Sequence, residues 1–163
     1  MKIEETWTYD APADRVFAML LDPAFQESKC AATGALTHSV TIDAQPPGDV
    51  IETHREMSTD GLPDNVSRLI GKTLRIVEIQ RWGTADADDV RSADLTVSIS
   101  GLPIDYTGQI RMTPDGDHTS MVVSGDLRAR IPLFGSKVES ASAPAISSGV
   151  RIEAETGAKY LAG

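Results

Sequence analysis

The sequence predicts an α+β protein that combines one antiparallel sheet of about seven strands with two short helices and one long C-terminal helix. Three observations lead to this fold class. A strand-like segment near the N-terminus is followed by two short helical segments, the middle of the chain is a series of strand-like segments joined by short turns, and the last part has a long helical pattern. Consecutive strands with short connections form an antiparallel meander. Such a sheet usually has one covered face, and the long last helix is the element available to cover it.

The N-terminal part predicts one strand and two helices. Residues 2–9 alternate between polar and apolar side chains, which favours a strand. A helix follows, in which Pro12 suits the first turn. Asp22 and Pro23 form a second cap followed by a proline, so another short helix is expected to begin there and to end at Gly34.

The middle of the chain predicts six further strands, each from alternating polarity between turn signals. They cover residues 36–45, 50–59, 73–83, 91–100, 103–112 and 119–131. No convincing helical period occurs between Leu36 and Ile131, apart from a turn at 66–70. The connection Asp60–Lys72 is too long for a hairpin. Because long loops in compact domains are often functional, we expect it to close one end of any pocket.

The C-terminal helix has unusually small side chains. Phe134 is expected to anchor its start against the sheet, and Pro144 is expected to kink or restart it. Ala141, Ala145 and Gly149 recur at a spacing of four on one face. Small residues there either leave a space above the sheet or allow the helix to pack closely on it.

Size and charge limit the possible functions. The chain has 163 residues, the length of one ordinary domain, so residues 1–163 are predicted to form a single domain. Its formal net charge of -9, from 24 acidic and 15 basic residues, argues against nucleic acid or an anionic membrane surface as a partner. No apolar run approaches the roughly 20 residues that cross a bilayer, so integral membrane association is not expected.

The cysteine content fits a reducing cytoplasm. Cys30 is the single cysteine and has no partner for an internal disulfide. The N-terminal residues lack the apolar region of a signal peptide. The protein is therefore expected to be cytoplasmic, and a monomer is assumed.

Local motifs for catalysis or metal binding are weak. Ile70–Thr73, "IGKT", looks like the end of a phosphate-binding loop, but Val66 stands where that loop needs a glycine and a strand follows. His38, His54 and His118 stand far apart, so neither a metal site nor a cofactor is expected. No catalytic residue is assigned.

Several stretches spread over the chain carry a resemblance. They are "APADRVFAMLLDPAFQE" with "ATGAL", "GLPDNVSRLIGKTLRIVEIQRWG" with "ADADD", and "IPLFGSKVE" with "APAI" and "RIEAETG". Together they resemble the DUF2505 proteins, an actinobacterial family of unknown function in the START and Bet v 1-like superfamily, which includes polyketide cyclase-like proteins. The resemblance implies a helix-grip fold, in which a hydrophobic cavity lies between a curved sheet and the last helix. Because this superfamily includes carriers, cyclases, dehydratases and chaperone activators, the fold does not determine the function.

The strand over residues 50–59 allows two orientations. In one, His54 faces inward between two glutamates and could act as a general base. In the other, Ile51 and Met57 are buried and Arg55 also turns inward. The second is favoured, because the glutamates would be costly to bury unpaired. Arg55 then becomes a candidate for gripping an anionic head group of a ligand.

The expected function is the binding of a small hydrophobic or amphipathic molecule, such as a lipid or a polyketide-like metabolite, in the implied cavity. The residues expected to contact it are Arg55, Met57, Leu69, Trp82, Leu95, Val97, Tyr106, Ile110, Met121, Val123, Ala145 and Gly149. One alternative is a cyclase- or dehydratase-type enzyme that uses a pocket His, Tyr or Arg. The other is a protein-interaction module of the chaperone-activator kind. A ligand-binding protein should have an apolar pocket, and an enzyme should have a deep pocket with an inward-facing His or carboxylate. A protein-interaction module should have a filled core and an exposed apolar patch.

Overall fold

The elements follow the predicted order along the chain. The computed structural model describes residues 1–45 and 47–163, with all of their side chains except those of Asn65, Val66 and Leu69. The elements are β1 (Lys2–Tyr9), α1 (Ala13–Leu20), α2 (Pro23–Ala32), β2 (Thr37–Gln45), β3 (Gly48–Ser58), α3 (Asp64–Ile70), β4 (Thr73–Trp82), β5 (Arg91–Ile99), β6 (Ile104–Asp115), β7 (His118–Ala129) and α4 (Gly135–Ala162).

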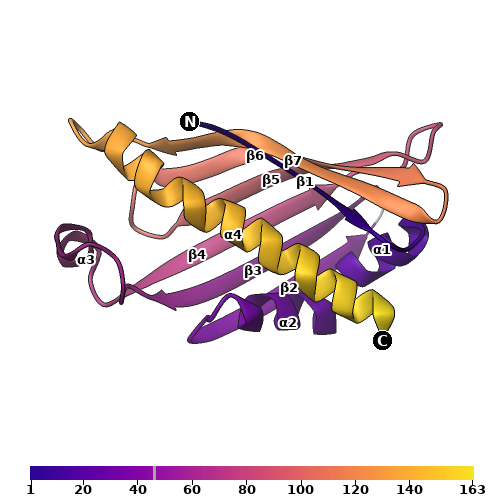
Figure 1. Cartoon of the computed structure of the whole chain (residues 1–163), viewed down its shortest axis with the longest axis horizontal. Helices are drawn as coiled ribbons and strands as arrows, with labels where there is room; N and C mark the ends of the chain where they lie inside the picture. The colour runs from indigo at the N-terminus through magenta and orange to yellow at the C-terminus, as the bar shows by residue number, and fades with distance from the viewer. Residues whose placement is uncertain (46) are drawn as a thin grey trace.

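The seven strands form one curved antiparallel sheet with β1 and β2 at its two edges. Their order across the sheet is β1-β7-β6-β5-β4-β3-β2, so the strands from β2 to β7 form a meander. After β1, the helices α1 and α2 carry the chain to the opposite edge, where β2 begins, and α4 crosses one face of the sheet (Figure 1). The predicted α+β class and the helix-grip arrangement are confirmed.

The starts of the first two helices follow from the predicted capping residues. Pro12 is the N-cap of α1. The Asp22 carboxylate accepts a hydrogen bond from the backbone N–H of Ala24 at 2.9 Å, and Pro23 is the first residue of α2. Gly34 has a φ of 79°, which glycine adopts without steric cost, and it reverses the chain after α2.

The inner face of the sheet is the face that the alternation predicts. Six apolar residues of the inner face belong to the buried core, and Val97 and Ile99 pack against it partly buried; the six are Leu95, Tyr106, Ile110, Met121, Val123 and Leu127. On β5, Asp94 and Thr96 alternate with them and are exposed. A shift of one residue would have exchanged the two faces, so the register is set by burial.

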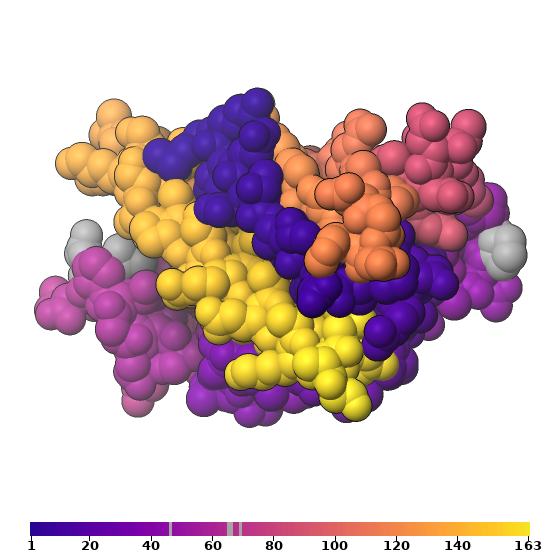
Figure 2. Space-filling model, turned by 45° about the vertical axis from the view of Figure 1, so that its right-hand side comes forward, coloured from indigo at the N-terminus to yellow at the C-terminus, as the bar shows by residue number. Residues whose placement is uncertain are grey.

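The long helix α4 lies between the N-terminal strand and the first two helices. In Figure 2 its yellow C-terminal half forms a diagonal band beside the indigo residues of the N-terminal segment. At this end the rings of Phe25 and Tyr160 meet edge to face with centroids 5.9 Å apart. The Arg15 guanidinium donates a hydrogen bond to the carbonyl of Leu161. The C-terminal end of α4 is therefore held against α1 and α2.

The helices differ from the expectation in two places. α3 is a helix where the sequence predicted no more than a turn, because seven residues are too few to display a helical period. α4 does not restart at Pro144 but continues from Gly135 to Ala162. Pro144 and Ser140, four residues before it, are both exposed, so water can bind the carbonyl that the proline leaves without a donor.

Phe134 does not anchor the start of α4. Its side chain is 55% exposed, and the preceding residue, Leu133, has a φ of 66° and is 95% exposed. The positive φ at Leu133 turns this corner outward. Val138, one turn further along, packs against the core instead.

Candidate ligand-binding cavity

A cavity of about 310 Å³ lies between the inner face of the sheet and α4. This volume is at the lower end of the range of roughly 300–1,000 Å³ that is usual for small-molecule sites. The apolar wall residues are Leu74, Ile76, Leu95, Val97, Ile99, Ile104, Ile110, Val123, Leu127, Val138, Ile146 and Val150. Burial of an apolar ligand against such walls is favourable by roughly 25 cal/mol for each Å² of apolar surface removed from water.

Two glycines of α4 show where the helix stands away from the sheet. A Cβ atom added to Gly149 would meet no atom within 4 Å, whereas one added to Gly157 would lie 2.6 Å from the ring of Tyr9. Ala141 and Ala145 also line the cavity together with Gly149. These small residues therefore face open space in the middle of α4, whereas the helix packs closely at Gly157 in its last turns.

Four charged side chains meet at one part of the cavity wall, and we call them the charge cluster: Lys29 of α2, Arg55 of β3, Glu78 of β4 and Glu153 of α4. The Lys29 ammonium is 2.9 Å from Oε1 of Glu78 and 3.3 Å from Oε2 of Glu153. The Arg55 guanidinium is 3.2 Å from Oε2 of Glu78. All four residues line the cavity, and their formal charges sum to zero.

The ion pairs within the charge cluster favour the ionised forms of Lys29 and Glu78 despite their burial. Burial raises the pKa of Glu78, but Lys29 and Arg55 outweigh it and hold that pKa well below its usual value. Burial lowers the pKa of Lys29, but Glu153 and Glu78 outweigh it and the pKa is raised. Removing one partner from such a cluster would leave an unpaired buried charge, which is costly.

A chain of hydrogen bonds fixes Glu78 from behind. The Gln80 amide donates to Oε1 of Glu78 at 2.9 Å, and the Trp82 indole N–H donates to the Gln80 carbonyl oxygen at 2.9 Å. These three residues alternate along β4 and so point to the same face of the sheet. Trp82 and Gln80 are almost fully buried, so the carboxylate of Glu78 has little freedom to move.

Two buried donors on the cavity wall have no acceptor among the described residues. They are Nε of Arg55 and the indole Nε1 of Trp7. Burial and then the Glu153 carboxylate raise the pKa of the Tyr9 hydroxyl, and the nearby Trp7 indole opposes this rise without meeting hydrogen-bond geometry. The Tyr9 hydroxyl donates to the carbonyl of Glu153 at 3.3 Å. The Tyr9 hydroxyl therefore lies near the Trp7 indole and contacts the backbone of Glu153, whose side chain belongs to the charge cluster.

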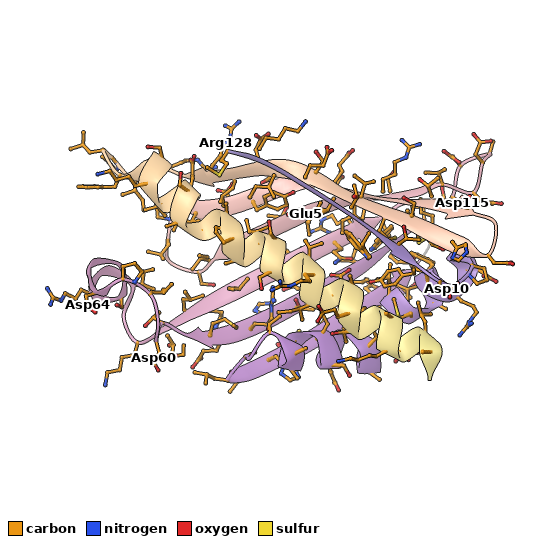
Figure 3. The ribbon with its side chains drawn as sticks, viewed as in Figure 1. Glu5, Asp10, Asp60, Asp64, Asp115 and Arg128 are labelled. Carbon is orange, nitrogen blue, oxygen red and sulfur yellow. The ribbon has the colours of Figure 1, made fainter. Side chains whose placement is uncertain are left out.

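The connection between β3 and β4 contributes to the cavity wall. Leu62, Pro63 and Ile70 line the cavity. Figure 3 labels Asp60 and Asp64 at this end of the molecule, where both side chains lie at the periphery. The same connection contains Val66 and Leu69, whose side chains lie outside the described residues.

Eight of the residues predicted to contact a ligand lie on the cavity wall: Arg55, Leu95, Val97, Tyr106, Ile110, Val123, Ala145 and Gly149. Three others do not line it. Trp82 is buried against Phe17 with ring centroids 5.6 Å apart, Met121 is fully buried in the core, and Met57 is half-buried beside Leu74 near the end of β3. The side chain of Leu69 lies outside the described residues.

The orientation of β3 is the one that the sequence favoured. Ile51 and Arg55 are buried, whereas the His54 side chain is 40% exposed on the outer face. His54 is 2.6 Å from the Glu52 carboxylate, which is also on the outer face. Among the described residues no histidine lines the cavity.

The sequence reading missed Lys29, Glu78 and Glu153. For Glu78 a signal was present: it shares the inward row of β4 with Leu74, Ile76 and Trp82, where a carboxylate is out of place. Lys29 and Glu153 gave no such signal. Each lies on a helix, where a charged residue is normally solvated.

Neither a metal site nor a membrane span was found in the described part of the chain. No group of three or more His, Cys, Asp or Glu side chains is placed to hold a metal ion among residues 1–45 and 47–163. No helix in the same ranges is long and apolar enough to cross a membrane.

The sheet, the long last helix and the cavity between them define a helix-grip fold. The Zhui aromatase/cyclase from a Streptomyces species has a similar structure, with a TM-score of 0.64 at 14% identity over 98% of this chain and 92% of that one. Human STARD10 has a TM-score of 0.62 at 11% identity over 98% of this chain and 64% of that one. A STAR-related lipid transfer protein from Xanthomonas axonopodis has a TM-score of 0.59 at 14% identity over 96% of this chain and 85% of that one.

Sequence gives the more specific assignment. Residues 4–161 match the family DUF2505, described as a protein of unknown function, and the chain belongs to this family. No curated protein matches the chain in sequence.

Proposed function

We propose that this protein binds a small hydrophobic or amphipathic molecule, of the size of a single acyl chain or a compact ring system, in the cavity under α4. The observation that carries the proposal is an apolar cavity of about 310 Å³ whose wall includes a buried charge cluster. An apolar body with one polar group matches both parts of this wall. The similar structures named for lipid transfer and for an aromatase/cyclase are consistent with a ligand of this kind.

The state of the polar groups favours binding over proton transfer. The Tyr106 hydroxyl donates to the carbonyl of Ile3 at 3.2 Å, and burial raises its pKa to about 12. Glu78 and Glu153 are held in ion pairs with Lys29. The pKa values of Tyr106 and Glu78 are both shifted away from neutral pH, whereas a general acid or base needs a pKa near the working pH.

The proposal includes a cellular context. Cys30 is buried, and burial raises the pKa of its thiol, so it behaves as a small apolar core residue. An unpaired buried thiol suits a reducing compartment, and we place the protein in the cytoplasm as a single-domain monomer.

Ala145→Leu tests the cavity directly. Because Ala145 faces the cavity, the larger side chain should fill it, abolish binding of the uncharged fluorescent probe Nile red, and leave the thermal midpoint unchanged or raise it. Ala158→Leu is the matched control: both alanines are exposed on the same helix, but Ala158 does not line the cavity and its variant should keep wild-type probe binding. Probe binding that survives Ala145→Leu, together with a loss of roughly 1–3 kcal/mol in the free energy of unfolding, would indicate close packing and refute the proposal.

Native mass spectrometry of protein purified from its own host identifies the ligand. We expect an additional mass of a small lipid or metabolite on the wild-type protein. The same additional mass should be missing from Ala145→Leu.

A further inference from the structure

Resting on the proposed binding function, we infer that the ligand is an uncharged molecule with a hydrogen-bond-accepting oxygen, such as a ketone or ester carbonyl, and that free carboxylates are excluded. The charge cluster selects for this class together with two unpaired donors on the cavity wall, one on Arg55 of the cluster and one on Trp7. The inference reverses the expectation that Arg55 grips an anionic head group.

The charge cluster has no positive charge to spare. Lys29 is shared by Glu78 and Glu153, and Arg55 is paired with Glu78. Lys29 is 2% exposed, and Glu78 and Glu153 are 12% and 13% exposed, so water cannot readily replace a lost partner. A ligand carboxylate would have to separate a cation from its glutamate and leave that glutamate buried without a partner. An ammonium group would compete with Lys29 and Arg55 in the same way.

What the site still offers is hydrogen-bond donors. Nε of Arg55 and Nε1 of Trp7 are buried on the cavity wall, and neither has an acceptor among the described residues. An unsatisfied buried donor is unfavourable, and a ligand acceptor that reaches it removes this penalty. Both groups only donate, so the matching ligand atom is an acceptor oxygen. The rest of the ligand lies against the apolar walls formed by β4 to β7 and α4.

A series of ligands with equal chain length tests the selection. Displacement of Nile red from the full chain at pH 8 is measured for 2-decanone, 1-chlorodecane, decanoate and decylamine. We expect 2-decanone to bind at least about tenfold more tightly than decanoate and decylamine, and several-fold more tightly than 1-chlorodecane, which is uncharged but lacks a strong acceptor.

Two kinds of variant separate charge balance from simple exclusion of charge by an apolar pocket. Glu78→Gln leaves one positive charge in excess and should raise the affinity for decanoate, relative to 2-decanone, by about tenfold or more. If Glu78→Gln does not fold, Glu153→Gln removes the same amount of negative charge from the cluster and replaces it in the test. Glu52→Gln, on the outer face of β3, should change nothing. Trp7→Phe and Arg55→Lys remove one unpaired donor each, and both should reduce the preference for 2-decanone over 1-chlorodecane. Circular dichroism confirms that each variant is folded.

The outcomes distinguish the inference from the proposed function. If decanoate binds wild-type protein as tightly as 2-decanone, or if the glutamate variants leave the preference unchanged, the inference is wrong while the cavity still binds ligands. If wild-type protein binds neither Nile red nor any of the four compounds, the proposed function fails and the inference fails with it.

Discussion

Glu78 is the residue on which the charge cluster depends. It accepts hydrogen bonds from Lys29 and Gln80 and pairs with Arg55, so it joins α2, β3 and β4 at one point. Its carboxylate is stabilised in the folded protein by two cations and lacks them in the unfolded chain. The net stabilisation from a buried ion pair of this kind is small, but removing one partner is costly because it leaves the other charge buried and unpaired.

The lowered pKa of Glu78 predicts a loss of stability in acid. The folded pKa lies below the ordinary value of 4.5, so the contribution of Glu78 is fully present above about pH 4.5 and is lost as the pH falls through the folded value. We expect the free energy of unfolding, measured by urea titration, to fall between pH 5 and pH 3 more steeply in the wild type than in Glu78→Gln. At pH 7 the variant should be less stable by roughly 3–5 kcal/mol. Equal slopes for the two proteins would contradict this assignment.

At the scale of elements, α4 changes its role along its length. Its first part stands over the cavity, and its last turns pack on β1 and α2. Gly149 and Gly157 look alike in the sequence, because both are glycines in the interior of a helix. Only at Gly157 would an added Cβ atom meet the ring of Tyr9. The sequence could not distinguish them, since the answer depends on the distance between the helix and Tyr9.

The two glycines therefore respond oppositely to alanine. Gly149→Ala meets open space, and alanine should stabilise the helix by roughly 0.5–1 kcal/mol. Gly157→Ala would bring a methyl group into the Tyr9 ring and should destabilise by roughly 1–3 kcal/mol. The free energy of unfolding of both variants is measured by chemical denaturation. A similar change in both would show that the space between α4 and the sheet is the same at the two glycines.

The strands show what alternation predicts well. Leu95 and Thr96 are neighbours on β5, one buried and one exposed. Leu95→Asp places an unpaired charge in the core and should prevent folding at ordinary temperature. Thr96→Asp should change the free energy of unfolding by no more than about 0.5 kcal/mol. Far-UV circular dichroism checks the first variant and urea titration the second; similar damage from both would mean that the assigned faces are wrong.

At the scale of the whole molecule, the sequence predicted the order of elements and the inward faces but not the charge cluster. Polarity patterns are local: the alternation within a single strand is enough to predict that Ile110 or Leu127 lies on the inward face. Lys29 meets Glu78 across 49 residues and Glu153 across 124 residues. No local pattern records such a pairing. The polar part of the candidate site therefore becomes visible only when the helices and the sheet are assembled.

The whole-molecule arrangement predicts how ligand access is controlled. Leu62, Pro63 and Ile70, from the connection Asp60–Lys72, lie at the cavity wall, so bound 2-decanone should slow amide hydrogen exchange in this connection. The hairpin around Asp115, at the opposite end in Figure 3, should exchange at an unchanged rate. Unchanged exchange in the connection 60–72 at saturating ligand would remove it from the entry path.

The placement of β1 beside β7 also affects how the chain acquires its structure during synthesis. Lys2 pairs with Asp126 and Tyr9 with Thr119, so the first strand must wait for more than a hundred residues before its partner exists. Such non-local pairing slows folding. The hairpins from β2 to β7 can form while the ribosome is still adding residues, but α4 follows all of them in the chain. Until α4 emerges, the apolar inner face of the sheet has no cover, and the nascent chain is then most prone to aggregation and most accessible to chaperones.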